Sequence, residues 1–330
     1  MKKVIVFGAT GHLGAYTVDY LKENLDKNRY EIIAVGRKTT NFFSEQGIEY
    51  YQVDVTKKED FLSLPTNDVY AVINLVGVMP AAMRGYTPKP YIEVNINGTL
   101  NILEYCRINH VNRIIYTQTE ADLSGHWESN KIITPDLPRK FSYKGNYSLY
   151  IISKCTAVDL IESYYHNHGL KRFIYRLPTV YHYRPDPYFY KDGEKKILGY
   201  RSLIDQAIKG KTIEIWGNPN LVKDIVYVKD FAQMVLKGIS VKHDGGIYNV
   251  GTGIGVSLED QIKGIVEVFS LKNQKSKITY RPDMPDTRSF IMDISNAKSE
   301  LGYKPQYNYM DYLTDFKIEM ELNRFEKLWT

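Results

Sequence analysis

The sequence contains only two cysteines in 330 residues, Cys106 and Cys155. Both fall in segments whose pattern predicts helix, so we expect buried thiols in a reducing compartment and no disulfide. No group of cysteines and histidines has the spacing of a metal site, so we expect no bound metal.

Long hydrophobic runs are also missing. The apolar run after Met1-Lys2-Lys3 ends at Gly8, after four residues, which is too short for a secretory signal. No stretch reaches the roughly 18 apolar residues that cross a membrane. We therefore expect a cytoplasmic protein without a membrane partner.

The chain has no block of positive charge. Its 43 basic and 38 acidic residues give a net charge of +5 without a Lys/Arg cluster. This distribution argues against a nucleic-acid partner and suits anionic small molecules. The length is sufficient for one large or two medium domains.

The first segments form a strand–loop–helix pattern. Residues 3–7 are a β-branched run typical of a strand buried on both faces, and Gly8-Ala-Thr-Gly11-His-Leu-Gly14 follows directly, opening a helix. Such glycines allow a tight turn and a close approach of the backbone to a diphosphate at the helix N-terminus. The pattern predicts a dinucleotide-binding loop.

The second strand, 31–35, ends in Gly36-Arg37-Lys38. An NAD site usually carries an acid here, which binds the adenosine ribose. Two cations are suited to a 2′-phosphate, so the sequence slightly favours NADP over NAD. A solvated turn is the alternative.

Strands and helices alternate along the first half of the chain. Further strands are expected at 50–53, 70–76, 113–117 and 171–176, with a helix between Tyr91 and Asn109. Alternation of this kind predicts an α/β fold with a doubly wound parallel sheet. Ligands then gather at the carboxyl ends of the strands.

Tyr150 and Lys154 lie four residues apart in an expected helix over 147–168, so both side chains point the same way. A free tyrosine titrates near about pH 10. A nearby ammonium favours the phenolate, which would lower the pKa of Tyr150 towards that of a general base. By itself such a pair is more often a solvated helix edge.

These motifs together resemble the extended short-chain dehydrogenase/reductase superfamily, in its NAD-dependent epimerase/dehydratase branch. The resemblance is carried, in chain order, by Gly8-x-x-Gly11-x-x-Gly14, Asp54, Asn95-x-x-Gly98-Thr99, Thr117-Gln-Thr119 and Tyr150-x-x-x-Lys154. It continues through Arg176-Leu-Pro-Thr-Val-Tyr181, residues 223–230, residues 248–253, Arg281-Pro-Asp and residues 301–305.

The resemblance implies a Rossmann domain over 1–177, to which 226–250 returns, and a substrate lobe of mixed α/β structure over 178–225 and 251–330. It implies that Tyr150, Lys154 and Thr119 are catalytic and that Asp54 lies at the adenine. The full set of expected cofactor-binding residues is Gly8, Gly11, His12, Leu13, Gly14, Arg37, Lys38, Asp54, Val55, Leu75, Val76, Gly77, Asn95, Thr117, Tyr150, Lys154 and Pro178. The expected substrate-binding residues are Met79, Thr119, Glu120, Thr179, Tyr181, Lys223 and Arg281.

The chain departs from the family pattern at several of these positions. Thr179 stands where Asn is common, and Lys223 replaces an Arg that binds phosphate, keeping the charge without bidentate geometry. Family dehydratases carry Thr-Asp-Glu where this chain has Thr119-Glu120-Ala121, which argues against dehydration.

Three assignments leave alternatives. The aromatic segment 181–190 is compatible with nucleobase stacking or with a packed surface loop. Arg288 competes with Arg281 as the diphosphate ligand. His12 is expected at the surface rather than in catalysis.

The resemblance predicts an NAD(P)-dependent nucleotide-sugar epimerase that oxidises a sugar hydroxyl transiently to a ketone. The partner is then a nucleotide-diphosphate sugar. The alternatives are an NADPH-dependent reductase or dehydratase and, from another class, a non-catalytic NADP-binding sensor. Helices 91–109 and 147–168 often pair across a two-fold axis in this family, so we also expect a homodimer.

Overall fold

The computed structural model describes residues 1–127, 132–191 and 193–329. Its main feature is a seven-stranded parallel sheet, with the strand order β14-β7-β5-β4-β1-β2-β3. The strands are β1 (Lys2–Phe7), β2 (Tyr30–Gly36), β3 (Glu49–Gln52), β4 (Val69–Asn74), β5 (Arg113–Thr119), β7 (Lys171–Leu177) and β14 (Gly245–Asn249). The expected doubly wound α/β fold is confirmed.

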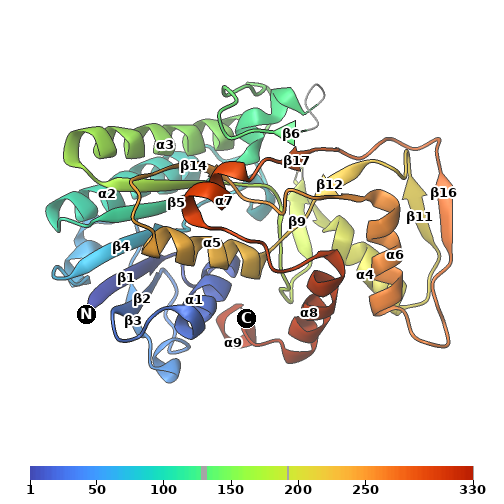
Figure 1. The fold of residues 1–330 in the computed structure, drawn as a ribbon, viewed down its shortest axis with the longest axis horizontal. Coiled ribbons are helices and arrows are strands. Elements are labelled where there is room, and N and C mark those ends of the chain that lie inside the picture. The colour runs from blue at the N-terminus through green and yellow to red at the C-terminus, as the bar shows by residue number, and fades with distance from the viewer. Residues whose placement is uncertain (128–131, 192, 330) are drawn as a thin grey trace.

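The sheet is covered by helices on both faces (Figure 1). On one face α1 (His12–Asn24) packs beside α5 (Val228–Ser240), and on the other α2 (Gly98–Ile108) packs beside α3 (Ser148–His168). Successive residues of β1 point to opposite faces, so Val4 and Val6 join one core and Ile5 and Phe7 the other. These β-branched and aromatic side chains are fully buried, which explains why the run forms a central strand.

The helix expected between Tyr91 and Asn109 has two parts. A π-helix, η4 (Tyr91–Asn97), leads directly into α2. A π-helix of this length is rare and often marks a functional site. Strand β4 ends at Asn74, earlier than expected, so Leu75 and Val76 already belong to the loop at the sheet edge.

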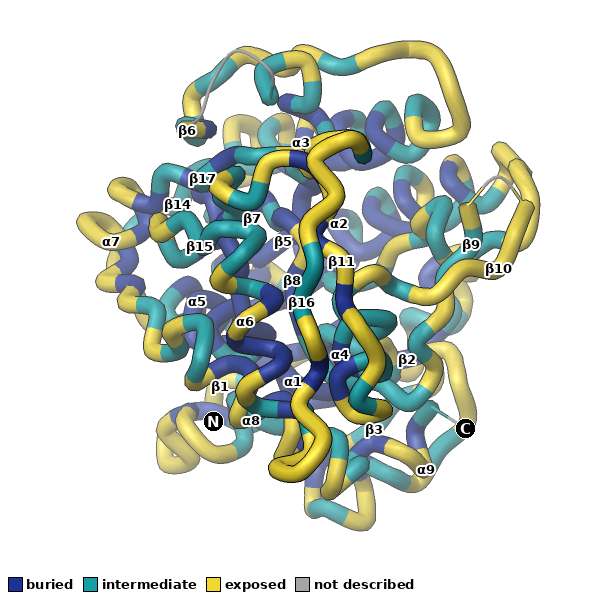
Figure 2. Tube along the Cα trace, turned by 90° about the vertical axis from the view of Figure 1, so that its right-hand side faces the viewer, coloured by how far each residue is buried: buried dark blue, intermediate teal, exposed yellow. Residues whose placement is uncertain are grey.

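The second half of the chain builds a smaller lobe, on the right in Figure 1. It contains α4 (Gly199–Ile208), α6 (Leu258–Phe269), α8 (Tyr309–Leu322), the parallel pair β11 (Ile213–Trp216) and β16 (Ile278–Arg281), and the hairpin β9 (Tyr188–Lys191)–β10 (Glu194–Ile197). In Figure 2 this hairpin lies at the edge of the molecule, and β10 is exposed along its length.

Short pairs connect the lobe to the sheet. They are β13 (Val226–Tyr227) with β8 (Val180–Tyr181), β12 (Val222–Asp224) with β15 (Gly255–Ser257), and β17 (Ile291–Met292) with β6 (Ile132–Ile133). The remaining helices are α7 (Ser295–Leu301), α9 (Glu326–Trp329) and the 3₁₀ turns η1 (Ser44–Gln46), η2 (Lys58–Ser63), η3 (Pro80–Ala82) and η5 (Glu120–His126). Strand β14 pairs with β7, so the chain passes from the lobe back to the main sheet. The division into two domains at Leu177 remains a prediction.

The C-terminal helix α9 returns to the first loop of the sheet. The Trp329 indole N–H donates to the Thr10 carbonyl oxygen at 3.2 Å, and the Trp329 ring contacts the His12 ring with centroids 4.8 Å apart. Within the described ranges, no helix has both the length and the apolar character of a membrane span.

Candidate active site

The glycine loop has no room for side chains. Gly8 has φ +82°, and a Cβ on it would lie 3.0 Å from the Leu75 carbonyl carbon. A Cβ at Gly14 would lie 2.1 Å from the Gly8 oxygen. Helix α1 begins at His12 without a side-chain cap from Gly11, so backbone N–H groups of its first turn face the loop. This geometry fits a diphosphate at the helix N-terminus.

The next two strand ends carry polar groups. After β3, the Asp54 carboxylate accepts hydrogen bonds from the Thr56 N–H and hydroxyl at 3.0 and 2.8 Å. Burial opposes the charge of Asp54, but these bonds and the charge of Arg37 hold its pKa below the usual value. After β2, the Lys38 ammonium donates to the Leu328 carbonyl oxygen at 3.1 Å. One of the two cations expected to bind a 2′-phosphate is therefore engaged by the C-terminal segment.

The loop after β4 is fixed by a buried amide. The Asn95 side chain accepts from the Val78 N–H at 2.8 Å and donates to the Val78 oxygen at 3.1 Å. It also donates to the Ser153 hydroxyl on α3 at 2.9 Å. A Cβ at Gly77 would lie 3.6 Å from Asn95 Oδ1 and 3.9 Å from Lys154 Nζ. The structure therefore brings Gly77, Asn95 and Lys154 together.

Three other expected cofactor residues lie at the carboxyl ends of the sheet strands. Leu75 and Val76 lie behind Gly8, and Thr117 is buried on β5, two residues before Thr119. Val55 is buried beneath Gly98 and accepts from the Asn101 amide at 2.8 Å, so its side chain belongs to the core. Leu13 is partly buried against the core, as is expected for the first turn of α1.

Lys154 is almost completely buried. Its ammonium lies 4.1 Å from the centre of the Tyr116 ring, which contributes a cation–π interaction. Burial lowers the pKa of Lys154 from 10.5 to about 7. At neutral pH the side chain is therefore close to the balance between ammonium and amine.

Thr119 and Tyr150 meet at the end of β5. The Thr119 hydroxyl lies against the phenol and favours the phenolate, but burial and the nearby Glu120 raise the pKa of Tyr150 above its ordinary value. The expectation that Lys154 sets a lowered pKa for Tyr150 is therefore wrong for the chain without ligands, because the desolvation of the phenol dominates.

Glu120 adjoins both residues. The Thr119 hydroxyl donates to Glu120 Oε2 at 3.3 Å. Burial raises the pKa of Glu120 to about 6, while the neighbouring cations Lys223 and Arg288 favour its charged form. The Lys223 ammonium donates to the Tyr181 hydroxyl at 3.2 Å, so the lobe brings positive charge to the same place.

Arg281 has partners of its own within the lobe. It lies on β16 with 44% of its side chain exposed and forms ion pairs with Asp283 at 2.7 Å and Glu214 at 3.6 Å. These ion pairs occupy the Arg281 guanidinium, so its role at the diphosphate remains a prediction. Arg288, the competing candidate, stacks 4.4 Å over the Trp127 ring and acts on both Glu120 and Lys223.

The other expected substrate residues differ in their exposure. Met79 precedes η3 and is half exposed, and Thr179 is exposed after the buried Pro178. Tyr181 is buried, with its ring 4.9 Å from that of Tyr200. Its ring therefore packs in the lobe instead of being free to stack on a nucleobase.

His12 is partly buried under neighbouring rings rather than fully exposed. Its ring lies between the rings of His182, 5.3 Å away, and Trp329, 4.8 Å away. Burial, followed by His182, lowers the pKa of His12 to about 3, so it is neutral at physiological pH. The sequence gives no signal for this contact because Trp329 lies at the opposite end of the chain.

Sequence reasoning also missed two aromatic neighbours of Tyr150. The rings of Tyr91 and Tyr147 each lie 6.3 Å from the Tyr150 ring. Tyr147 could have been found, because it precedes Tyr150 by three residues at the start of the same helix. Tyr91 comes from η4, and nothing in the sequence links it to α3.

In the described part of the chain, no three His, Cys, Asp or Glu side chains lie close enough together to bind a metal ion. The polar groups gathered at the sheet edge are instead a phenol, a lysine, a hydroxyl and a carboxyl beside a glycine loop. That set fits proton exchange with a bound alcohol next to a dinucleotide.

Comparison with known proteins agrees with this geometry. A curated relative, a putative UDP-glucose 4-epimerase of Methanocaldococcus jannaschii, is 26% identical over 311 residues, covering 92% of this chain and 93% of the relative. The crystal structure of UDP-glucose 4-epimerase from Thermotoga maritima with UDP-glucose matches with a TM-score of 0.72 and 22% identity, covering 97% of this chain and 99% of that one. UDP-N-acetylglucosamine 4-epimerase from Bacillus cereus matches with a TM-score of 0.75 and 22% identity, covering 97% and 100%.

The family model described as the NAD dependent epimerase/dehydratase family matches residues 4–251. That range runs from β1 to the end of β14 and includes the glycine loop, Thr119, Tyr150 and Lys154. The chain belongs to the NAD-dependent epimerase/dehydratase family and is an enzyme of that family.

Proposed function

We propose that this protein is a nucleotide-sugar epimerase that inverts a sugar carbon by oxidising its hydroxyl transiently and reducing the ketone from the other face. The observation that carries the proposal is the convergence of Thr119, Tyr150 and Lys154 beside the Gly77 loop. The relatives named as epimerases support it.

Each residue has a distinct task in this scheme. Thr119 binds the sugar hydroxyl and orients its proton towards the phenol. Tyr150, as phenolate, accepts that proton and later returns it. Lys154, when protonated, favours the phenolate through its charge. Bound NAD supplies the hydride acceptor and a positive ring that also favours the phenolate.

The environment of Tyr150 explains why proton removal by its phenolate would need bound cofactor. In the chain alone, burial raises the pKa of Tyr150 and lowers that of Lys154. Both shifts favour a neutral pair. A positively charged nicotinamide ring beside the phenol would reverse this preference and favour the phenolate of Tyr150.

The expected preference for NADP has no support beyond the Arg37-Lys38 dipeptide. The family is NAD-dependent, and Lys38 already binds the Leu328 oxygen. We propose NAD as the cofactor. The dissociation constants of NAD and NADP, measured by calorimetry, test this choice, and tighter binding of NADP would restore the first expectation.

The substrate is proposed to be a nucleotide-diphosphate sugar. Lys223 and Arg288 both act on Glu120, next to Thr119, and are the cations that we propose for the diphosphate. Thr179, Met79 and the Tyr181 hydroxyl remain expected substrate contacts. The formation of a homodimer through η4–α2 and α3 remains a prediction, to be tested by light scattering.

Dehydration is the second candidate, because Glu120 lies next to Thr119 and burial raises its pKa to about 6. A carboxyl with such a pKa is able to protonate a leaving hydroxyl. Ala121 removes the second acid of the dehydratase pattern, which is why epimerisation ranks first.

The test is to incubate the purified protein with UDP-glucose and with UDP-N-acetylglucosamine and to analyse the sugars by NMR and mass spectrometry. An epimer of unchanged mass, formed without net consumption of NAD, supports the proposal. Loss of water identifies a dehydratase, and stoichiometric consumption of NADPH identifies a reductase.

Tyr150→Phe provides the matched variant. It keeps the ring and removes the proton acceptor, so we expect turnover to fall by roughly 10²–10⁴-fold with nearly unchanged NAD affinity. A fully active Tyr150→Phe enzyme would refute the mechanism. Tyr143→Phe, an exposed tyrosine in the segment before α3, is the control.

A further inference from the structure

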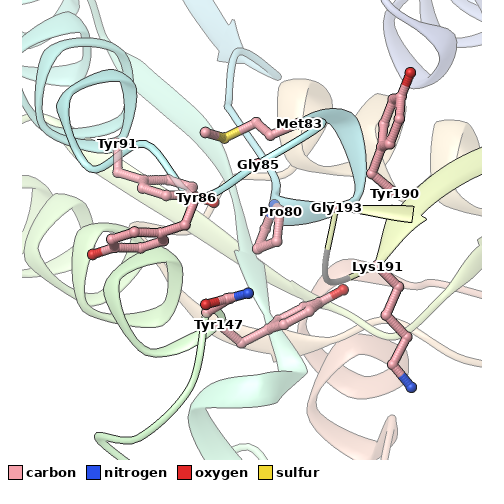
Figure 3. A pocket seen from close by; sticks show the side chains of 10 residues that line it. Pro80, Met83, Gly85, Tyr86, Tyr91, Tyr147, Tyr190, Lys191 and Gly193 are labelled. Atoms are coloured by element: carbon pink, nitrogen blue, oxygen red, sulfur yellow. The ribbon is translucent and has the colours of Figure 1, made fainter. Parts of the chain in front are cut away.

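A small cavity lies between the η3 loop and the β9–β10 hairpin, against the start of α3. Four tyrosines contribute to its lining, together with Pro80 and Met83, and its volume is about 120 Å³. In Figure 3 the Tyr147 ring lies across one side of it, opposite Pro80 and Met83.

The cavity adjoins the proposed catalytic phenol. Two of its lining residues, Tyr91 and Tyr147, are the residues whose rings lie 6.3 Å from that of Tyr150. A sugar whose hydroxyl contacts Tyr150 and Thr119 would therefore bring another substituent of the same ring close to this space. Neither Lys223 nor Arg288, the cations proposed for the diphosphate, is among its lining residues, so we assign the cavity to the sugar.

The walls come from two segments that meet only in the folded chain. Strand β9 packs on η3, and a Cβ at Gly193, in the hairpin turn, would lie 3.4 Å from the Arg84 oxygen. The hairpin thus closes one side of the cavity. Its length and sequence decide which substituent the site accepts.

The lining combines tyrosine rings, Pro80 and Met83 with the side chain of Asn146, and it includes no carboxylate. Lys191 is the single charged residue among the described lining residues; it is exposed, and its ammonium points away from the other lining side chains in Figure 3. A carboxylate on the sugar would lose its hydration here without gaining a buried partner, which is costly. A methyl group would bury apolar surface against tyrosine rings, which is favourable.

The volume of the cavity limits the group that it can hold. Pockets that hold a whole drug-sized ligand measure roughly 300–1,000 Å³. A volume of about 120 Å³ accommodates only part of a ligand. We propose that this cavity is a subsite for the neutral acyl group of an acylamino sugar, such as the acetamido group of UDP-N-acetylglucosamine. This inference rests on the proposed function, because it assumes a nucleotide sugar at Tyr150.

The test compares UDP-N-acetylglucosamine, UDP-glucose and UDP-glucuronic acid. Dissociation constants by calorimetry and kcat/KM by NMR are measured for each with the NAD-loaded protein. A hydrophobic pocket distinguishes one small group by roughly 10–200-fold, so we expect a preference of that order for the acetylated sugar over UDP-glucose. UDP-glucuronic acid should bind most weakly.

Two variants test the cavity itself. Gly85 lines it, and a Cβ there meets no atom within 4 Å, so Gly85→Leu is compatible with the fold and is expected to fill the space. It should abolish the preference for the acetylated sugar while UDP-glucose binding changes little. Tyr147→Ala removes one wall of the cavity. Because Tyr147 also contacts Tyr150, the measured quantity is the ratio of kcat/KM for UDP-N-acetylglucosamine to kcat/KM for UDP-glucose. This ratio should fall towards one. Tyr143→Ala, outside this cavity, should leave the ratio unchanged.

The outcomes separate this inference from the proposed function. Epimerisation of all three sugars at similar efficiency, or a preference that Gly85→Leu and Tyr147→Ala leave intact, overturns the subsite and leaves the epimerase standing. Selective binding of the acetylated sugar without epimerisation supports the subsite and overturns the epimerase. Binding of none of the three sugars overturns both.

Discussion

The Asn95 side-chain amide donates to the Ser153 hydroxyl at 2.9 Å in the buried core. Ser153 in turn donates to the Tyr150 carbonyl oxygen at 2.8 Å. Because Asn95 also binds both backbone groups of Val78, a single amide fixes the loop after β4, the π-helix and the start of α3 relative to one another. The positions of Gly77 and Lys154 depend on this link.

Asn95→Leu should therefore damage both stability and activity. The change leaves the Val78 N–H and the Ser153 hydroxyl without their partner, and each unsatisfied buried group costs about 1–3 kcal/mol. We expect a lower free energy of unfolding in urea and weaker NAD binding. Asn97→Leu, at an exposed position of the same π-helix, is the control. Equal stability of the two variants would contradict this role.

Lys154 should make stability depend on pH. Burial lowers its pKa from 10.5 to about 7, so between those values the unfolded chain binds the proton and the folded chain does not. Stability then rises with pH through this window, and the cost of burying the ammonium is fully present below about pH 7.

Lys154→Met removes that cost while keeping the length of the side chain. Without cofactor, the variant should resist urea better than the parent at pH values below the window, and this advantage should shrink as the pH approaches the upper limit. Lys272→Met, at an exposed site, should show no such trend. An advantage that is independent of pH would exclude the titration of Lys154 as its source.

Glu120 should control the pH dependence of turnover. Its negative charge is the second cause, after burial, of the raised pKa of Tyr150. Glu120→Gln keeps a group that can bind the Thr119 hydroxyl and removes the charge, so the acidic limb of kcat against pH should move to lower pH. Glu93→Gln on the π-helix is the control. A dehydratase would instead lose its water-eliminating activity in Glu120→Gln.

The glycine loop, the strands and the Tyr150–Lys154 pair were predictable because each depends on local sequence. A buried β-branched run followed by three spaced glycines predicts a strand and a dinucleotide-binding loop. Parallel strands then bring their carboxyl ends to one edge of the sheet. The raised pKa of Tyr150 was not predictable, since it results from burial by segments distant in sequence. The contacts of His12 with His182 and Trp329, and of Lys38 with Leu328, were not predictable either, because these partners are also distant in sequence.

The sequence did not decide whether Arg281 or Arg288 binds the diphosphate, because their surroundings depend on the folded chain. Arg281 ends β16 and pairs with Asp283, whereas Arg288, in the segment that follows, lies near Glu120 and Lys223. Arg288→Ala should weaken the binding of UDP, measured by calorimetry, by about 1.5–3 kcal/mol, as expected for a hydrogen bond to a charged group. Arg281→Ala should change it little. The reverse order would return Arg281 to the diphosphate.

Trp329 should stabilise the cofactor loop from outside. Its indole N–H binds the Thr10 oxygen, its ring packs on His12, and the preceding Leu328 oxygen accepts from Lys38. Trp329→Ala removes the first two contacts and leaves the glycines intact, so NAD binding should weaken through a less ordered loop. Trp216→Ala, at a half-exposed site on β11, controls for the loss of an indole. Slower hydrogen exchange at residues 8–14 in the parent than in Trp329→Ala would identify loop order as the cause, whereas equal exchange with equal NAD affinity would show that α9 only covers the loop.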